Sequence, residues 1–142
     1  MTIKDIIKSK GFEVIAVDAE TTVDEAIRKM IDRNIGALLV MEDGKTSGMF
    51  TERDVLKCWT VKGTFQDVKV KEVMTRDLLV AEAEDDVCYA SSIMIQKRVR
   101  HLPVVEKGKV VSVLSIRDVV KAQVSNLQAE VHYLKDYITD IG

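Results

Sequence analysis

The stretch of sequence that decides the fold is Gly48-Met49-Phe50-Thr51-Glu52-Arg53-Asp54, because it returns 64 positions later as Ser112-Val113-Leu114-Ser115-Ile116-Arg117-Asp118. In both copies an apolar run ends at a hydroxyl residue, and an aspartate follows three positions later. A hydroxyl in that place is a typical helix N-cap. The stretch therefore predicts a strand that turns directly into a helix, twice.

The duplication extends well beyond this stretch. Ala19–Lys57 overlays Ala83–Lys121 without a gap, and 15 of the 39 positions are identical. Further upstream, Ile3–Ile7 resembles Val70–Met74 at an offset of 67. A self-similar period of this size indicates a repeated structural unit. We expect one repeat over residues 1–62, a second over 63–122, and a C-terminal amphipathic helix over 123–142.

Each copy predicts the same order of elements. A short helix (Ile3–Lys8; Val70–Met74) leads to an extended stretch (Val14–Val17; Leu78–Ala81), a longer helix, two strands and a last helix. Thr22, with Glu25 three residues later, has the spacing of a capping box. The apolar face expected on the longer helix consists of Val23, Ala26, Ile27, Met30 and Ile31 in the first copy and Val87, Ala90, Met94 and Ile95 in the second.

Two hairpins complete the expected fold. Asp43-Gly44 separates the apolar runs Ala37–Met41 and Met49–Phe50, and Lys107-Gly108 separates Leu102–Val105 from Val110–Leu114. Because one copy is too small to cover its own sheet, the two should pack together. We therefore expect an α+β (or α/β) fold of two β-α-β-β-α repeats, packed sheet to sheet with pseudo-two-fold symmetry.

Composition excludes several function classes. Apolar residues make up 46% and charged residues 31% of the 142, and the net charge of −2 disfavours nucleic acid as a partner. No stretch approaches the roughly 20 apolar residues of a membrane span, so a cytoplasmic protein is expected. Cys58 and Cys88 match no metal or redox spacing and are expected to be small buried apolar residues of helices, so we expect no metal site.

Candidate ligand-binding residues lie at the two strand-to-helix junctions. A helix N-terminus suits a phosphate, and Asp54 or Asp118 could accept hydrogen bonds from a ribose diol. The alternative is that both aspartates only cap helices. The second copy also carries Lys97-Arg98-Val99-Arg100-His101 where the first has a largely neutral stretch, which suggests an anion near Arg100 and His101, or else a solvated helix end. Pro103 suits a sheet edge or strand entry.

The chain resembles a tandem pair of cystathionine-β-synthase (CBS) domains, the Bateman module, over about residues 3–125. The resemblance is carried by Ile35–Val40 with Gly48–Asp54, and by Arg100–Val105 with Ser115–Asp118. It implies an adenosyl ligand: AMP, ADP, ATP, a nicotinamide dinucleotide (NAD(H)) or S-adenosylmethionine. It also implies two unequal sites, because the glycine that often opens the motif is Gly48 in one copy and Ser112 in the other.

The resemblance further implies the residues of each site. Asp118, with Ser115 and Arg117, would hold the ribose in one site, and Arg100 and His101 would reach phosphate. The adenine there would be lined by Ile15, Ile35, Gly36 and Ala37. The pseudo-symmetric site would use Thr51, Arg53, Asp54, Leu79, Val80, Val99 and Arg100, and Leu102 and Pro103 complete the candidate set.

The C-terminal segment carries a heptad seam. Its apolar positions are Val120, Val124, Leu127, Val131, Leu134, Ile138 and Ile141, spaced 4, 3, 4, 3, 4 and 3 apart. An isolated helix of this length is marginal in water, so the seam needs a surface to pack on. We expect a homodimer contact, and the alternative is packing back on its own domain.

The function expected from these observations is non-catalytic regulation. No metal cluster or glycine-rich phosphate loop is present in the sequence, and no nucleophile is placed beside either histidine. We expect an energy- or redox-sensing module that signals nucleotide binding to an unidentified regulated protein and requires no cofactor. The alternatives are a structural dimerisation unit with an empty cleft, or a module that binds S-adenosylmethionine.

Overall fold

The computed structural model describes residues 1–141, and side chains for 1–139. It contains two compact units, each built on a three-stranded sheet. The first-repeat unit comprises Glu13–Val80, and the second-repeat unit combines Met1–Phe12 with the residues from Ala81 onward.

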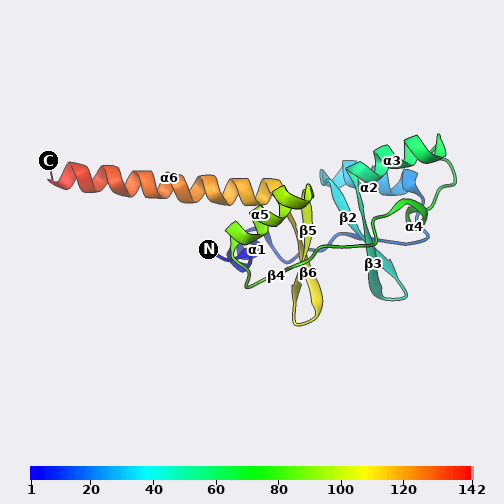
Figure 1. Cartoon of the computed structure of the whole chain (residues 1–142), viewed down its shortest axis with the longest axis horizontal. Coiled ribbons are helices and arrows are strands. Elements are labelled where there is room, and N and C mark those ends of the chain that lie inside the picture. Colours follow the sequence, from blue (N-terminus) through cyan, green and yellow to red (C-terminus); the bar gives the residue numbers. More distant parts are fainter. Residues whose placement is uncertain (142) are drawn as a thin grey trace. The chain divides into compact units, whose positions relative to one another are not determined.

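The two units contain matching elements (Figure 1). The first-repeat unit contains β1 (Ala16–Asp18), α2 (Val23–Arg33), β2 (Ala37–Glu42), β3 (Lys45–Thr51), α3 (Glu52–Lys62) and α4 (Val70–Val73). The second-repeat unit contains α1 (Ile3–Lys10), β4 (Ala81–Glu82), α5 (Val87–Lys97), β5 (His101–Glu106), β6 (Lys109–Ser115) and α6 (Ile116–Ile141). The sheet orders are β1-β2-β3 and β4-β5-β6, with the central strand parallel to the first and antiparallel to the third. The expected α+β class and element order are confirmed.

The short helices are exchanged between the repeats. In the second-repeat unit, Ile3 N donates to Asp85 O (2.9 Å) and Lys4 N to Ala83 O (2.8 Å). In the first-repeat unit, Val70 N donates to Thr21 O (2.9 Å) and Lys71 N to Ala19 O (3.2 Å). The helix that precedes each repeat in the sequence therefore packs with the other repeat, and the compact units differ from the segments 1–62 and 63–122 at these helices.

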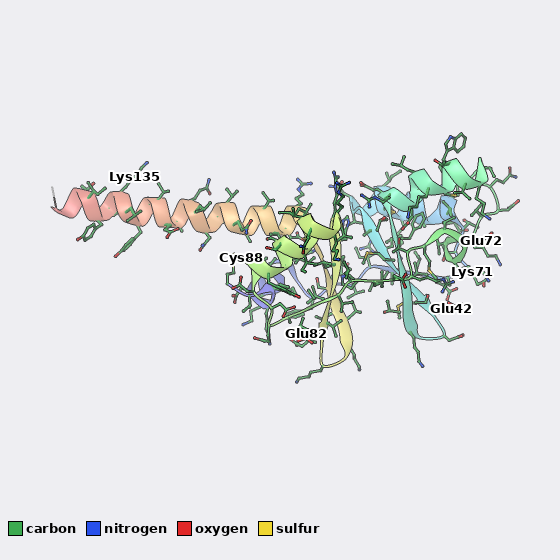
Figure 2. The ribbon with its side chains drawn as sticks, in the orientation of Figure 1. Glu42, Lys71, Glu72, Glu82, Cys88 and Lys135 are labelled. Carbon is green, nitrogen blue, oxygen red and sulfur yellow. The ribbon has the colours of Figure 1, made fainter. Side chains whose placement is uncertain are left out.

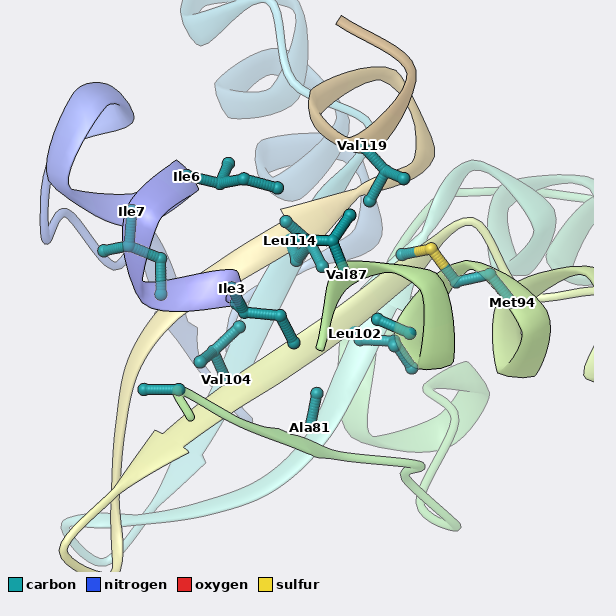
Figure 3. Close-up of a cluster of buried hydrophobic side chains, with 12 residues drawn as sticks. Ile3, Ile6, Ile7, Ala81, Val87, Met94, Leu102, Val104, Leu114 and Val119 are labelled. Atoms are coloured by element: carbon teal, nitrogen blue, oxygen red, sulfur yellow. The ribbon is translucent and has the colours of Figure 1, made fainter. Parts of the chain in front are cut away.

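The apolar residues of the exchanged helix α1 are the ones that it buries in the second-repeat unit. Ile3 and Ile7 of α1 are fully buried and join Leu102, Val104 and Leu114 in one apolar cluster, which Figure 3 shows around β5 and β6. Full burial of an isoleucine side chain contributes about 1.5–3 kcal/mol. In the first-repeat unit, the matching cluster around Phe50 receives Val70 and Met74 from α4 and the residue after it.

Local signals predicted both hairpin turns and the N-cap of α2. Asp43 and Gly44 both have positive φ (52° and 76°), as do Lys107 and Gly108 (52° and 75°), which is the two-residue hairpin geometry that Gly favours. Thr22 Oγ1 accepts a hydrogen bond from Glu25 N (3.2 Å) at the start of α2. The two hairpin turns and the Thr22 cap are confirmed, whereas the returning hydrogen bond to the Glu25 side chain that a capping box needs is not among the bonds described for α2.

Three local predictions are wrong. Ile31 and Ile95 are 71% and 73% exposed, because at 100° per residue each lies on the flank of the stripe that buries the methionine before it. Cys88 is exposed on α5, whereas Cys58 is buried on α3. Pro103 lies inside the central strand β5, paired with Val113, and not at a sheet edge or strand entry.

The last predicted helix and the C-terminal helix are one element. The helix α6 runs without interruption from Ile116 to Ile141, so the segment expected over 123–142 is the continuation of the helix that Ser115 begins. Its first turns pack on α1, α5 and β6. Beyond Gln123, every residue to Thr139 is exposed, so its own unit does not cover the heptad seam. The side chain of Ile141 lies outside the described residues.

Candidate functional site

In each unit, the helix that directly follows the third strand (α3 or α6) starts beside the entry of the central strand. Ile116 N donates to Arg100 O (2.8 Å), and His101 pairs with Ser115 across the sheet. The first-repeat unit repeats this geometry, where Glu52 N donates to Gly36 O (3.2 Å) and Ala37 pairs with Thr51. The structure therefore brings the predicted phosphate-binding pair, Arg100 and His101, to the predicted ribose-binding motif of the same unit.

The carboxylate of Asp118 lies in a polar, half-open environment. Its Oδ2 accepts hydrogen bonds from Ser115 N (2.9 Å) and from Lys10 Nζ (2.7 Å), and Asp118 N donates to Ser115 Oγ (3.0 Å). The side chain is 23% exposed. Partial burial acts to raise the pKa of Asp118, but the bonds from Lys10 and Ser115 outweigh it, and the pKa is lowered from its ordinary value. The group is thus a charged acceptor near neutral pH.

The carboxylate of Asp54 is enclosed. Asp54 is 1% exposed, and its oxygens accept hydrogen bonds from Thr51 N (2.9 Å), Thr51 Oγ1 (3.2 Å) and Thr75 Oγ1 (3.0 Å). Three donors therefore satisfy this carboxylate inside its own unit. The two aspartates that the repeat makes equivalent in sequence differ in access and in partners.

The first residue of each motif, Gly48 or Ser112, differs in the space available to its side chain. A Cβ added at Gly48 would lie 2.7 Å from Thr75 O and 2.8 Å from Met74 Sδ, so the passing Met74–Thr75 segment requires glycine. That segment is held by a bridge in which Met49 and Thr75 exchange two backbone hydrogen bonds of 2.9 Å. In the other unit Ser112 is fully buried, and its Oγ has no hydrogen-bond partner among the described residues.

The first strand of the second sheet, β4, is shorter than its counterpart β1, and Pro103 explains the difference. Leu39 N donates to Ile15 O (3.1 Å), and β1 begins at the next residue, Ala16. Pro103 occupies the position of Leu39 and has no N–H to give Leu79. Accordingly β4 begins only at Ala81, and Leu79 and Val80 are 39% and 54% exposed.

The predicted site residues divide between the two units. Those in the second-repeat unit are Val99, Arg100, His101, Leu102, Pro103, Ser115, Arg117 and Asp118, and those in the first-repeat unit are Ile15, Ile35, Gly36, Ala37, Thr51, Arg53, Asp54, Leu79 and Val80. Arg53, Arg100 and Arg117 are exposed. The sequence reasoning missed Lys10 and Thr75, which contact the two aspartates. The resemblance at offset 67 ends at Ile7 and Met74, before either residue, so it did not point to them.

Within residues 1–141, no helix has both the length and the apolar character that a membrane crossing needs. Among the described side chains, those of residues 1–139, no cluster of three or more histidine, cysteine, aspartate or glutamate side chains has the arrangement of a metal site.

The fold and the paired motifs define a tandem of two small α+β domains related by duplication. The family model described as the CBS domain matches residues 2–60 and 70–125. The CBS domain-containing protein CBSX3, mitochondrial, of Arabidopsis thaliana is 34% identical over 96% of this chain and 71% of its own length. The chain belongs to the CBS-domain family.

Solved structures agree with this assignment. The crystal structure of the CBS domain protein NE2398 has a TM-score of 0.84 and 39% identity, over 87% of this chain and 98% of that one. The CBS domain pair of protein MJ0100, solved in complex with 5-methylthioadenosine and S-adenosyl-L-methionine, has a TM-score of 0.74 and 25% identity, over 86% and 98% of the two chains.

Proposed function

We propose that this chain is a non-catalytic, cytoplasmic regulatory module that binds an adenine nucleotide at its duplicated strand-to-helix motif and signals the binding to a partner protein. AMP is the first candidate ligand, and ADP, ATP and NAD(H) share its adenosine. The observation that carries the proposal is the Ser115–Asp118 helix start, where a half-open carboxylate, a hydroxyl and the Arg100–His101 pair meet beside one strand entry.

Each part of this motif matches a part of a nucleotide. The Asp118 carboxylate has the acceptor oxygens that a ribose diol needs, and the positive end of the α6 dipole with Arg100 favours phosphate. By the family resemblance, Ile15, Ile35, Gly36 and Ala37 would line the adenine. Because Asp54 is buried with three donors, we propose that the Asp118 site binds more tightly than the Asp54 site.

A second candidate ligand is S-adenosylmethionine or its product 5-methylthioadenosine. The support is the solved MJ0100 pair, which holds both compounds. These ligands share the adenosine and lack phosphate, so they would use Asp118 without needing Arg100. A structural dimerisation unit with an empty cleft is the remaining alternative.

Calorimetry with a panel of ligands separates these possibilities. The panel is adenosine, 5-methylthioadenosine, S-adenosylmethionine, AMP, ATP and NADH, titrated into the full chain. Asp118→Asn should weaken every adenosyl ligand that binds, by roughly 5- to 100-fold, the size expected for losing charge-assisted hydrogen bonds. Arg100→Gln should weaken only the ligands that carry phosphate. The matched control is Asp43→Asn in the β2–β3 turn, where asparagine tolerates the positive φ.

The outcomes are distinct. Binding of AMP or ATP that Arg100→Gln weakens supports the nucleotide reading, and binding of 5-methylthioadenosine that Arg100→Gln leaves unchanged supports the second candidate. An affinity that Asp118→Asn does not alter would refute the site. Silence across the panel, with the protein folded by circular dichroism, would favour the structural dimerisation unit.

The signalling part of the proposal requires two arrangements of the protein. A ligand shifts an equilibrium only by its difference in affinity for the two states. The helix that carries Asp118 continues directly into the exposed part of α6, which we propose as the homodimer contact. Ligand binding at the helix start could thus be read out at the dimer or at a regulated protein.

A further inference from the structure

The exposed part of α6 carries an apolar stripe that its own unit leaves uncovered. The residues of the stripe are Val120 (50% exposed), Val124 (46%), Leu127 (58%), Val131 (50%), Leu134 (51%) and Ile138 (67%). From Val124 onward this stripe is about 20 Å long at 1.5 Å per residue. A helix that exposes such a stripe in water gains stability only when another surface covers it.

The residue types along the stripe favour a two-stranded coiled coil. Spacings of three and four place Val124, Val131 and Ile138 at position a of the heptad, and Leu127 and Leu134 at position d. Every described a position is therefore β-branched, and the two d positions that follow Val124 are both leucine. Parallel dimers prefer β-branched residues at a with leucine at d.

The charges that flank the stripe define the direction of the partner helix. Glu130 lies at position g and Lys135 at position e, five residues later. In a parallel, in-register pair, each g residue meets the e residue five positions later on the partner helix. Glu130 of each copy would then face Lys135 of the other, and Gln123 would face Gln128 in the preceding heptad.

An antiparallel pair would lose this complementarity. There g positions face g positions and e positions face e positions, so the lysines at e (Lys121 and Lys135) would lie on the same side as one another. Within the side chains described for this chain, neither Glu130 nor Lys135 forms an ion pair. Figure 2 shows Lys135 on the exposed length of α6. Both groups are thus available to a partner.

We infer that two copies of this chain pair through α6 as a parallel, in-register coiled coil over residues 120–138. The inference deepens the dimer contact of the proposed function and does not depend on ligand binding. Its consequence is geometric: parallel helices bring both α6 N-termini, and with them both Ser115–Asp118 motifs, to the same end of the coil. Ser115 lies only five residues before the first stripe residue, Val120.

Charge reversal in the full chain tests the pairing. Glu130→Lys and Lys135→Glu each replace two attractions by two repulsions, and we expect each to weaken dimerisation by about 5- to 20-fold in sedimentation equilibrium. The double variant Glu130→Lys/Lys135→Glu should restore the dimer. An equimolar mixture of the two single variants should form a mixed dimer, because both of its ion pairs are attractive.

Disulfide trapping tests the direction separately. In a Cys88→Ser background, Leu127→Cys should form an intermolecular disulfide under mild oxidation, because a parallel register brings the two position-127 side chains together. The matched control is Ser125→Cys, which lies at the outward b position and should stay monomeric on non-reducing gels. Retained helicity by circular dichroism shows that the variants are folded.

Several results would overturn the inference. A monomer at high micromolar concentration would do so, as would a dimer that neither charge reversal weakens. A dimer that traps Ser125→Cys as fast as Leu127→Cys would place the contact elsewhere. Because no ligand is added, none of these results bears on the nucleotide proposal.

Discussion

Lys10 Nζ lies 2.7 Å from Asp118 Oδ2 and 2.5 Å from the carbonyl oxygen of Val113, so one ammonium joins the helix start to the preceding strand. In the other unit, Thr75 joins the helix start to the preceding strand through two of its groups. Its backbone N–H donates to Met49 O (2.9 Å), and its hydroxyl donates to Asp54 (3.0 Å). The Asp118 site therefore has the flexible Lys10 side chain at the position where the Asp54 site has the backbone bridge between Thr75 and Met49.

Lys10→Met should increase the affinity for an uncharged adenosyl ligand. In the proposed site, a ribose diol and the Lys10 ammonium compete for the same carboxylate. Removing a partly exposed ion pair of about 0.5–1 kcal/mol should strengthen adenosine or 5-methylthioadenosine binding by roughly 2- to 5-fold in calorimetry. Lys8→Met, on the same helix, is the control. A weaker ligand affinity in Lys10→Met would show that Lys10 contacts the ligand and does not compete with it.

Asp54→Ala should destabilise the protein more than Asp118→Ala. Loss of the buried Asp54 carboxylate leaves the Thr51 amide without its acceptor, at a cost of about 2–4 kcal/mol. Asp118 is partly exposed, so water can replace it, and about 1 kcal/mol is expected. Urea unfolding of both variants measures the difference. Equal costs would contradict the contrast in burial between the two carboxylates.

Gly48→Ala and Ser112→Ala should have opposite effects on stability. The new methyl group at residue 48 meets Thr75 O and Met74 Sδ below 3 Å, which should cost about 1–3 kcal/mol. At residue 112 the change removes a buried hydroxyl without a described partner, so a neutral or slightly stabilising effect is expected. Thermal denaturation of the two variants checks this, and a destabilised Ser112→Ala would reveal a bond to that hydroxyl.

Glu20→Gln should reduce the stability lost on acidification. Hydrogen bonds from Lys69 and Lys71 lower the pKa of Glu20 to about 2, from 4.5. Because the folded-state pKa is the lower one, the stabilisation is present above pH 4.5 and is lost as the pH falls towards 2. Melting temperatures of wild type and Glu20→Gln should therefore differ at pH 7 and converge near pH 2. Asp32→Asn, at an exposed carboxylate of α2, is the control and should show a smaller change.

High salt provides a second check on the Glu20 contacts. These ion pairs are exposed, so about 1 M salt should screen them and shrink the difference between wild type and Glu20→Gln at pH 7. A difference that persists in high salt would indicate that the glutamine disturbs packing instead.

Much of this fold could be predicted because its signals are local. The hairpins follow from Asp43-Gly44 and Lys107-Gly108, and the helix starts follow from Thr22, Thr51 and Ser115, since turn geometry and capping depend on a few neighbouring residues. The gapless repeat then predicted the same element order in both copies and the paired aspartates. The heptad seam likewise needed only the spacing along one helix.

The sequence by itself determined the repeated elements, their order and the residues of each motif. Only the tertiary structure decided that α1 packs with the second repeat and α4 with the first, that Asp54 is closed by Thr75, and that Asp118 is held by Lys10. The Lys10–Asp118 contact joins residues 108 positions apart. Such contacts depend on which surfaces are buried together, and burial is a property of the packed chain that no short stretch of sequence encodes.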